Sequence, residues 1–209
     1  MESVSHITLS RQTALKRQMG VISNNIANMD TTGYRRQSMM FEEVLRDTQD
    51  GETGNLSFTQ DVSTFYKLQQ GPLEKTGNPL DLAINEDGYF TVQTEDGARY
   101  TRDGSFAVNN ENQLVTKQDR AVLDTNGNPI EIPENAGKIE VAQDGTISTP
   151  EGEIAQLNIV DFENIQALDR RADSLYAPGD QEPQPVDQPE VHQGMLESSN
   201  VQGITQMTN

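Results

Sequence analysis

The chain has 209 residues, a formal net charge of -18 at pH 7 and 33% hydrophobic residues, with no Cys and no Trp. Such acidity argues against nucleic acid as a partner, and the absence of Cys excludes disulfides, thiol nucleophiles and Cys-ligated metals. The low apolar content predicts a small core with extensions rather than a large enzyme.

Residues 3–29 are predicted to form an amphipathic helix that ends by about Asp30. Five apolar residues recur at intervals of four, three, four and three, which places them on one stripe of a helix. We call this stripe the apolar seam: Leu15, Met19, Ile22, Ile26 and Met29. No other part of the chain repeats this pattern at comparable length. The partner of the apolar seam is therefore either a short C-terminal segment or another polypeptide.

The segment after the helix contains two weaker patterns. Residues 35–46 form a short amphipathic stretch that is either helical or extended, and we group them with the helix as an N-terminal helical segment, residues 1–46. Residues 47–61 are mostly polar and carry glycines without a sustained period, which predicts an exposed loop. Alternation from Asp61 to Leu68 then predicts a first strand.

Residues 62–176 carry the strongest β signal of the chain. Short apolar runs are separated by four Asp-Gly pairs, a combination typical of tight hairpins because Gly accepts a positive φ. The pairs are Asp87-Gly88, Asp96-Gly97, Asp103-Gly104 and Asp144-Gly145. The fold class predicted for the chain is therefore mainly β, with a central antiparallel, hairpin-rich domain that is sandwich-like or barrel-like.

Composition changes again toward the C-terminus. Residues 177–192 contain four prolines among acidic and amide residues, which predicts an extended linker. Residues 193–209 follow as the predicted start of a helical segment, because Ser198, Ser199 and Asn200 are suitable N-cap residues.

Few residues support catalysis or ligand binding. His6 and His192, the two histidines, lie at opposite ends of the chain without carboxylates at ligand spacing, so we expect no metal site and no cofactor. Glycoside hydrolysis by two acids is the one enzyme class open to this composition, but turns explain the Asp residues before Gly, so we predict no enzyme. Tyr89, Arg99, Tyr100 and Arg102 form an alternative, a binding patch on the β domain.

The chain also lacks the sequence features of membrane insertion and of signal-dependent secretion. There is no run of about 18 apolar residues, and the first residues lack a basic start followed by an apolar stretch. We therefore expect no membrane insertion and no cleaved signal peptide.

Three groups of motifs resemble bacterial flagellar rod and hook proteins. The first is Ile22-Ser23-Asn24-Asn25-Ile26-Ala27-Asn28 with Thr31-Thr32-Gly33-Tyr34, which is similar to the N-terminal rod motif. The second, in the middle, includes Thr76-Gly77-Asn78-Pro79-Leu80-Asp81 and Tyr100-Thr101-Arg102-Asp103-Gly104-Ser105-Phe106. The third is Gln193-Gly194-Met195-Leu196-Glu197-Ser198-Ser199-Asn200-Val201, near the C-terminus. Leu9-Ser10-Arg11-Gln12 most resembles the proximal rod subunit.

The resemblance implies a structural subunit of the flagellar basal-body rod. Such a subunit leaves the cytoplasm through the flagellar export apparatus, without a cleaved signal, and packs with other rod and hook-type subunits in the periplasm. One alternative is a distal rod or hook subunit. The other is a periplasmic binding module, in which the patch of Tyr89, Arg99, Tyr100 and Arg102 recognises a periplasmic component such as cell-wall glycan. Because family members continue for several helical turns after the Leu-Glu-x-x-Asn-Val motif, the resemblance also implies that the C-terminal helix is truncated in this chain.

By position, the resemblance implies which residues pack between subunits. These are Leu15, Met19, Ile22, Asn24, Asn25, Ile26, Met29, Gly33, Leu196 and Val201. For the asparagines two interpretations remain, hydrogen bonds between subunits or a weakening of the helix near its end. Gly33 is expected to fix the direction in which the chain enters the β domain.

Overall fold

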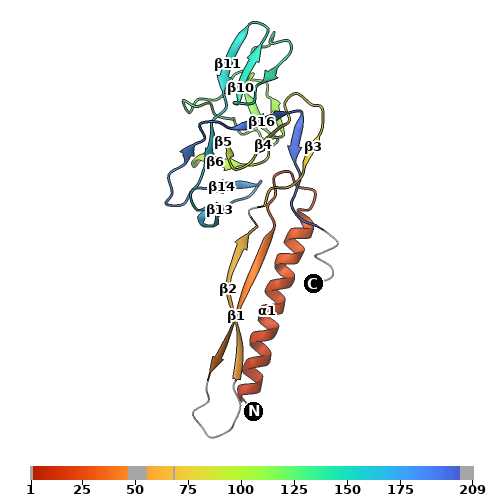
Figure 1. Ribbon diagram of the computed structural model, residues 1–209, viewed down its shortest axis with the longest axis vertical. Coiled ribbons are helices and arrows are strands. Elements are labelled where there is room, and N and C mark those ends of the chain that lie inside the picture. Colours follow the sequence, from red (N-terminus) through yellow and green to blue (C-terminus); the bar gives the residue numbers. More distant parts are fainter. Residues whose placement is uncertain (1, 47–55, 68, 203–209) are drawn as a thin grey trace. The chain divides into compact units, whose positions relative to one another are not determined.

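The computed structural model describes residues 2–46, 56–67 and 69–202 (Figure 1). The chain divides into two compact units. Unit 1 comprises the described residues of Met1–Met29, Arg35–Lys67 and Val201–Asn209, and unit 2 comprises those of Asp30–Tyr34 and Leu68–Asn200.

Unit 1 is a helix packed on a two-stranded sheet. Helix α1 spans Glu2–Ala27, and strands β1 (Gln37–Arg46) and β2 (Leu56–Tyr66) pair antiparallel, with Gln37 opposite Tyr66 and Arg46 opposite Leu56. The register shifts once, between Met40 and Phe41. Both strands contact α1 (Figure 1).

The predicted N-terminal helix is confirmed, and its end is set by asparagines. The Asn28 N–H donates to the carbonyl of Asn24 at 3.2 Å, and the Asn28 side-chain amide donates to the same carbonyl at 2.8 Å. These bonds satisfy a carbonyl that the last helical turn leaves open. Gly33 has the expected positive φ of 66°, but it lies in the following turn, six residues beyond the last helical residue.

Two sequence predictions for unit 1 are wrong. Residues 37–46, grouped with the helical segment, form strand β1, because their backbone groups pair with β2. Residues 56–61, predicted as part of an exposed loop, already belong to β2. The alternation Leu56-Ser57-Phe58-Thr59 is typical of a strand, but the polar, glycine-bearing residues before it led to its assignment to the loop. Residues 47–55 of the predicted loop lie outside the described part of the chain.

Unit 2 is built from short antiparallel strands and one 3-10 turn, which confirms a mainly β fold. Its elements are β3 (Leu73–Lys75), β4 (Leu82–Asn85), β5 (Tyr89–Thr94), β6 (Gly97–Thr101), β7 (Phe106–Val108), β8 (Leu114–Thr116), β9 (Glu140–Val141), β10 (Thr146–Thr149), β11 (Gly152–Gln156), β12 (Ile159–Asp161), η1 (Ile165–Ala167), β13 (Asp169–Arg170), β14 (Leu175–Ala177), β15 (Gln184–Pro185), β16 (Glu190–Gln193) and β17 (Met195–Glu197).

A six-stranded sheet of order β13-β14-β6-β5-β12-β15 organises unit 2. Both faces of its central strand β5 are buried. Phe90 and Val92 face the main apolar cluster, whereas Tyr89 faces a second, aromatic cluster with Tyr100 and Phe162. The rings of Tyr100 and Phe162 meet edge to face with centroids 4.8 Å apart. The sheet therefore separates two small cores, which fits a chain poor in apolar residues.

The Asp-Gly signal located two hairpins correctly. Asp144-Gly145 lies in the turn between the antiparallel strands β9 and β10, where Gly145 has a φ of 82°. Strands β5 and β6 pair with Thr94 opposite Gly97, and Gly97 adopts a φ of 102° at the turn. At Asp103-Gly104 the glycine has another purpose, because a Cβ there would lie 1.7 Å from the carbonyl oxygen of Leu82. The Asp-Gly pairs thus mark both turns and close backbone contacts.

The predicted linker at residues 177–192 is wrong, because this segment folds onto unit 2. Strand β15 pairs with β12, strand β16 pairs with β4, and Val191 is buried in the main cluster. Pro185 fits because β15 is an edge strand, where a missing N–H leaves no partner unpaired.

The predicted helix start at residues 193–209 is also wrong where the chain is described. Residues 195–197 form strand β17, paired with β3, and residues 198–202 contain no helix. The Ser198 N–H donates to the carbonyl of Pro72 at 2.9 Å, so this backbone group stabilises an extended chain instead of a helix. Residues 203–209 lie outside the described part of the chain.

Candidate functional site: the apolar seam and the terminal junction

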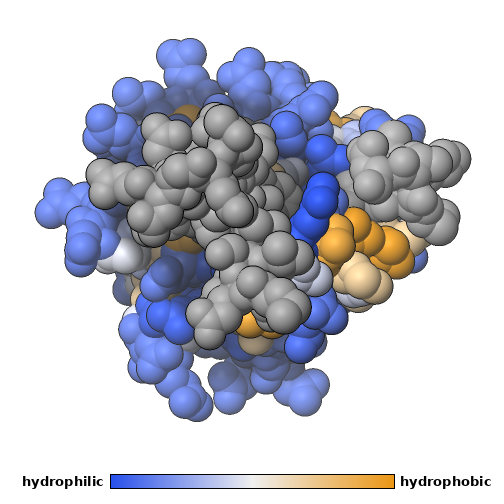
Figure 2. Space-filling view, turned by 90° about the horizontal axis from the view of Figure 1, so that it is seen from below, coloured by the Kyte–Doolittle hydropathy of each residue, from blue (hydrophilic) through white to orange (hydrophobic). Residues whose placement is uncertain are grey.

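Helix α1 has two distinct long stripes, and the apolar seam is the more exposed one. Leu15 is 57% exposed, Met19 69%, Ile26 38% and Met29 43%, while Ile22 is half-buried. In the view of Figure 2 most of the coloured surface is hydrophilic and hydrophobic residues gather in small groups. A stripe of large apolar side chains exposed along a helix is a surface that favours burial against a partner.

The other stripe is shifted by one residue, about 100° around the helix. It consists of Ala14, Gln18, Val21, Asn25 and Asn28, all buried or half-buried. In the described part of the helix, the packed stripe is thus formed mainly by small and polar residues, while Leu15, Met19 and Ile26 are left exposed.

Asn25 anchors the buried stripe to the strand that follows. Its side-chain Nδ2 donates to the carbonyl of Gln37 at 2.8 Å, and the Gln37 N–H donates to Asn25 Oδ1 at 2.9 Å. The amide therefore pairs with the backbone as a neighbouring strand would, and it is 1% exposed. Both interpretations of this asparagine from sequence missed its role, which is to attach β1 to α1.

Unit 2 brings the N-terminal turn and the C-terminal motif together. The Gly33 N–H donates to the carbonyl of Glu197 at 2.7 Å, and the Asn200 N–H donates to the carbonyl of Tyr34 at 3.2 Å. We call this place the terminal junction: residues 31–34, 71–72, 102 and 197–200. Segments more than 160 residues apart in sequence are thus paired by their backbones.

A buried ion pair lies at the centre of the terminal junction. Arg102 Nε lies 2.9 Å from Glu197 Oε2, and the two side chains are 1% and 2% exposed. The Gly71 N–H donates to Glu197 Oε1, and the Arg102 guanidinium donates to the carbonyls of Gly88 and Glu86. A buried charge is tolerated only when it is paired and hydrogen-bonded in this way.

Two glycines allow the backbones of the terminal junction to approach. A Cβ at Gly71 would lie 1.8 Å from the carbonyl oxygen of Ser198, and a Cβ at Gly33 would lie 2.7 Å from the carbonyl carbon of Arg102. The guanidinium of Arg170 lies 4.0 Å from the centre of the Tyr34 ring and covers it. The junction therefore has a fixed geometry.

The predicted site residues are divided between these places. Leu15, Met19, Asn24 and Ile26 are exposed on the helix, and Met29 is exposed in the turn after it. Gly33 lies in the terminal junction. Leu196 is half-buried in β17 and Val201 is buried. Sequence analysis did not single out Gly71 or Glu197 and assigned Arg102 to another role, since an isolated charge in a strand gives no sign of burial until its partner is known.

The predicted binding patch on the β domain is wrong. Tyr89, Tyr100 and Arg102 are all buried, and only the side chain of Arg99 keeps part of its surface. Burial raises the pKa of the Tyr100 hydroxyl, against the opposing effect of Arg99. These residues belong to the aromatic core and the terminal junction, so they do not offer a surface to a glycan.

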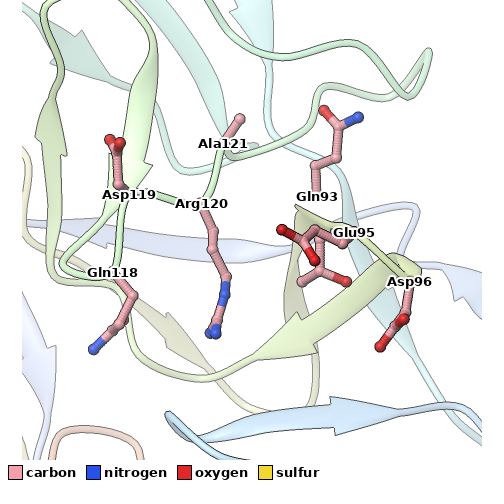
Figure 3. A pocket seen from close by; sticks show the side chains of 8 residues that line it. Gln93, Glu95, Asp96, Gln118, Asp119, Arg120 and Ala121 are labelled. Carbon is pink, nitrogen blue, oxygen red and sulfur yellow. The ribbon is translucent and has the colours of Figure 1, made fainter.

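A polar cleft of about 740 Å³ lies in unit 2, between the β5–β6 turn and the loop after β8 (Figure 3). Its lining includes Glu95, Asp96 and Asp119 together with Arg120, whose Nη2 is held by Asp173 at 2.7 Å. The residues described as lining it include no histidine or serine to serve as base or nucleophile. The cleft thus offers charges without an arrangement that points to a reaction.

No group of three or more His, Asp or Glu side chains within residues 2–46, 56–67 and 69–202 is arranged to hold a metal ion. No helix in this described part combines the length and apolarity that a membrane span requires.

Comparison with known protein families finds matches in two regions of the chain. Residues 7–35 match the family of flagella basal body rod proteins, and residues 83–149 match the D1 domain of flagellar hook proteins FlgE/F/G. The first match covers most of α1 and the N-terminal turn, and the second covers much of unit 2.

Several curated proteins are similar over the whole chain. Flagellar basal-body rod protein FlgF of Caulobacter vibrioides is 37% identical over 212 residues, covering 100% of this chain and 86% of that protein. FlgF of Rhizobium meliloti is 34% identical with the same coverage. Flagellar basal-body rod protein FlgG of Buchnera aphidicola is also 34% identical, covering 91% of this chain and 82% of that protein.

Proposed function

Because the chain belongs to the family of bacterial flagellar basal-body rod proteins and is a structural subunit of that rod, we propose that it enters the assembly through its apolar seam. The observation that carries this proposal is the exposure of Leu15, Met19 and Ile26 on α1 and of Met29 in the turn that follows it. Burial of these side chains against helices of other rod and hook-type subunits supplies the driving force, at about 25 cal/mol for each Å² of apolar surface.

The chain is proposed to be the proximal rod subunit of FlgF type. Relatives named FlgF match it over its entire length, whereas the first FlgG relative matches 91% of it. The motif Leu9-Ser10-Arg11-Gln12 lies within the region that matches the rod family.

The terminal junction has a supporting role in this proposal. Backbone bonds from Gly33 and Asn200, together with the Arg102–Glu197 ion pair, hold residues 31–34 beside residues 197–200. The two ends of the chain therefore leave unit 2 from one place, which suits a subunit that assembles through terminal segments.

Export through the flagellar apparatus without a cleaved signal, residence in the periplasm and the absence of catalysis complete the proposal. Support for the first two comes from membership of the rod protein family. Support for the last comes from the acidic residues, several of which serve in turns, such as Asp103 and Asp144.

Paired substitutions on α1 test the apolar seam. Leu15→Asp with Ile26→Asp places two charges where burial is proposed, and each unpaired charge strongly opposes transfer out of water. We expect incorporation into purified basal bodies, measured by immunoblotting, to fall at least about tenfold.

The matched control is Thr13→Asp with Ala27→Asp. Both residues are exposed, and both lie on the side of α1 away from the two stripes. The control adds the same charge to the same helix and should leave incorporation near the level of the unmodified chain. Equal incorporation of the two double variants would contradict the proposed role of the apolar seam.

A further inference from the structure

Three of the five methionines whose side chains the structure describes are exposed. The sequence has seven Met and no Cys. Among the side chains that the structure describes, Met19 on the apolar seam is the most exposed large hydrophobic one at 69%, ahead of Met40 at 55% and Met29 at 43%. Met39 and Met195 are half-buried.

We propose that Met19 is an oxidation site and that its conversion to the sulfoxide disables the apolar seam. A sulfur lone pair attacks one oxygen of a hydroperoxide such as hydrogen peroxide. The S–O bond forms while the O–O bond breaks, and the departing hydroxide takes up the proton and leaves as water. Sulfur loses two electrons and the peroxide gains two, so no further reactant is needed.

Exposure makes Met19 the preferred target among the five methionines that the structure describes. Thioether oxidation requires direct access of the oxidant to sulfur, and no Cys thiolate is present to react first. Met39 and Met195 carry the same chemical group but are shielded by neighbouring residues. Accessibility therefore sets the order of reaction.

The consequence for assembly rests on the proposed function of the apolar seam. A sulfoxide oxygen is a strong hydrogen-bond acceptor that water satisfies while Met19 is exposed. Between apolar helices it would lose that water without gaining a donor, which lowers affinity on the order of tenfold for each buried group. Reduction by a methionine sulfoxide reductase restores the thioether, so the modification is reversible.

Peptide mapping tests the site itself, independently of assembly. The full-length chain is treated with increasing hydrogen peroxide and digested, and sulfoxides are quantified by mass spectrometry. We expect Met19 to be oxidised severalfold faster than Met39 and Met195. Oxidation of either half-buried Met at the same rate or faster would overturn the assignment.

Polar substitution tests the consequence in cells. Met19→Gln places a hydrogen-bonding group on the apolar seam, whereas Met40→Gln places the same group at an exposed Met on β1, outside it. We expect Met19→Gln to lower incorporation into basal bodies about tenfold and Met40→Gln to leave it unchanged. If Met19→Gln incorporates normally while Leu15→Asp with Ile26→Asp fails to incorporate, the inference about Met19 is overturned. If the double variant also incorporates normally, the proposed function itself is wrong.

Discussion

Gly33 shows how a single residue limits the geometry of the terminal junction. It has a positive φ of 66°, and a Cβ would lie 2.7 Å from the Arg102 carbonyl carbon. Gly33→Ala should therefore lower the free energy of unfolding by about 1–3 kcal/mol. Urea unfolding followed by tyrosine fluorescence reports on this region, because four of the five tyrosines lie in unit 2.

The control for this substitution is Gly20→Ala. Gly20 lies within α1 and a Cβ there would meet no atom within 4 Å, so Ala should stabilise the helix by about 0.5–1 kcal/mol. Destabilisation by both variants would show that the loss at Gly33 is not specific to the junction.

The contributions of Arg102 and Glu197 to the stability of unit 2 are predicted to depend on each other. Glu197→Gln leaves a buried guanidinium without its counter-charge and should cost about 3–5 kcal/mol, measured by urea unfolding. Arg102→Met combined with Glu197→Gln should cost less than the two single changes together. Additive losses would show that the two side chains do not stabilise each other.

An exposed ion pair provides the comparison for these single and double substitutions. Lys138 and Glu140 lie 2.7 Å apart but keep most of their surface in water. Glu140→Gln, alone or combined with Lys138→Met, should change the free energy of unfolding by no more than the experimental error.

Asp124 is predicted to contribute to the loss of stability in acid. Burial raises the pKa of its carboxyl, but hydrogen bonds from Asn128 and Asn126 lower it by more, so the pKa lies below its usual value. A lowered folded pKa stabilises the fold above the pKa of an unfolded Asp, about 3.9, and this contribution is lost as pH falls through the folded value. Between pH 6 and pH 3 the melting temperature of Asp124→Asn should therefore fall less than that of the unmodified chain. An equal fall of the two melting temperatures over this pH range would contradict the prediction.

Among the elements, helix α1 depends most on partners outside itself. Its large apolar residues are exposed, and the residues that do pack contact a sheet that needs β2. We expect the peptide of residues 1–46 to show little helix by circular dichroism, because isolated helices are marginal in water. Helicity in the peptide equal to that of the same residues in the full chain would contradict this expectation.

The elements also show which patterns reveal structure from sequence. The helix was predictable because its apolar period extends over four turns, and the β5–β6 hairpin because Asp96-Gly97 separates two strand-like runs. Strands β15 to β17 were not predictable, since each is only two to four residues long and forms because β12, β4 or β3 offers an edge. Local propensity at residues 177–201 was overridden by these long-range pairings.

For the whole molecule, charge is divided sharply between the two units. Unit 2 contains 8 Lys and Arg against 26 Asp and Glu, a net charge of -18, whereas unit 1 contains seven of each and is neutral. Like charges within unit 2 repel each other, and salt screens this repulsion as the Debye length falls from about 30 Å at 0.01 M to about 8 Å at 0.15 M.

Added salt should therefore stabilise unit 2 more than unit 1. We expect the melting temperature measured by tyrosine fluorescence to rise by several degrees between 0.01 M and 0.15 M sodium chloride. The transition measured by helical circular dichroism, which follows α1, should move less. Equal shifts of the two signals would show that the division of charge does not affect stability.

The sequence by itself determined the family, the N-terminal helix with its apolar seam and the mainly β fold, because each is encoded in motifs or periods that neighbouring residues carry together. Only the tertiary structure decided that the seam faces away from the strands of unit 1, that Asn25 attaches β1 to α1, and that residues 177–200 complete unit 2. The tertiary structure also decided that Arg102 and Glu197 meet as a buried ion pair. Burial and pairing depend on residues distant in the chain, which local pattern does not specify.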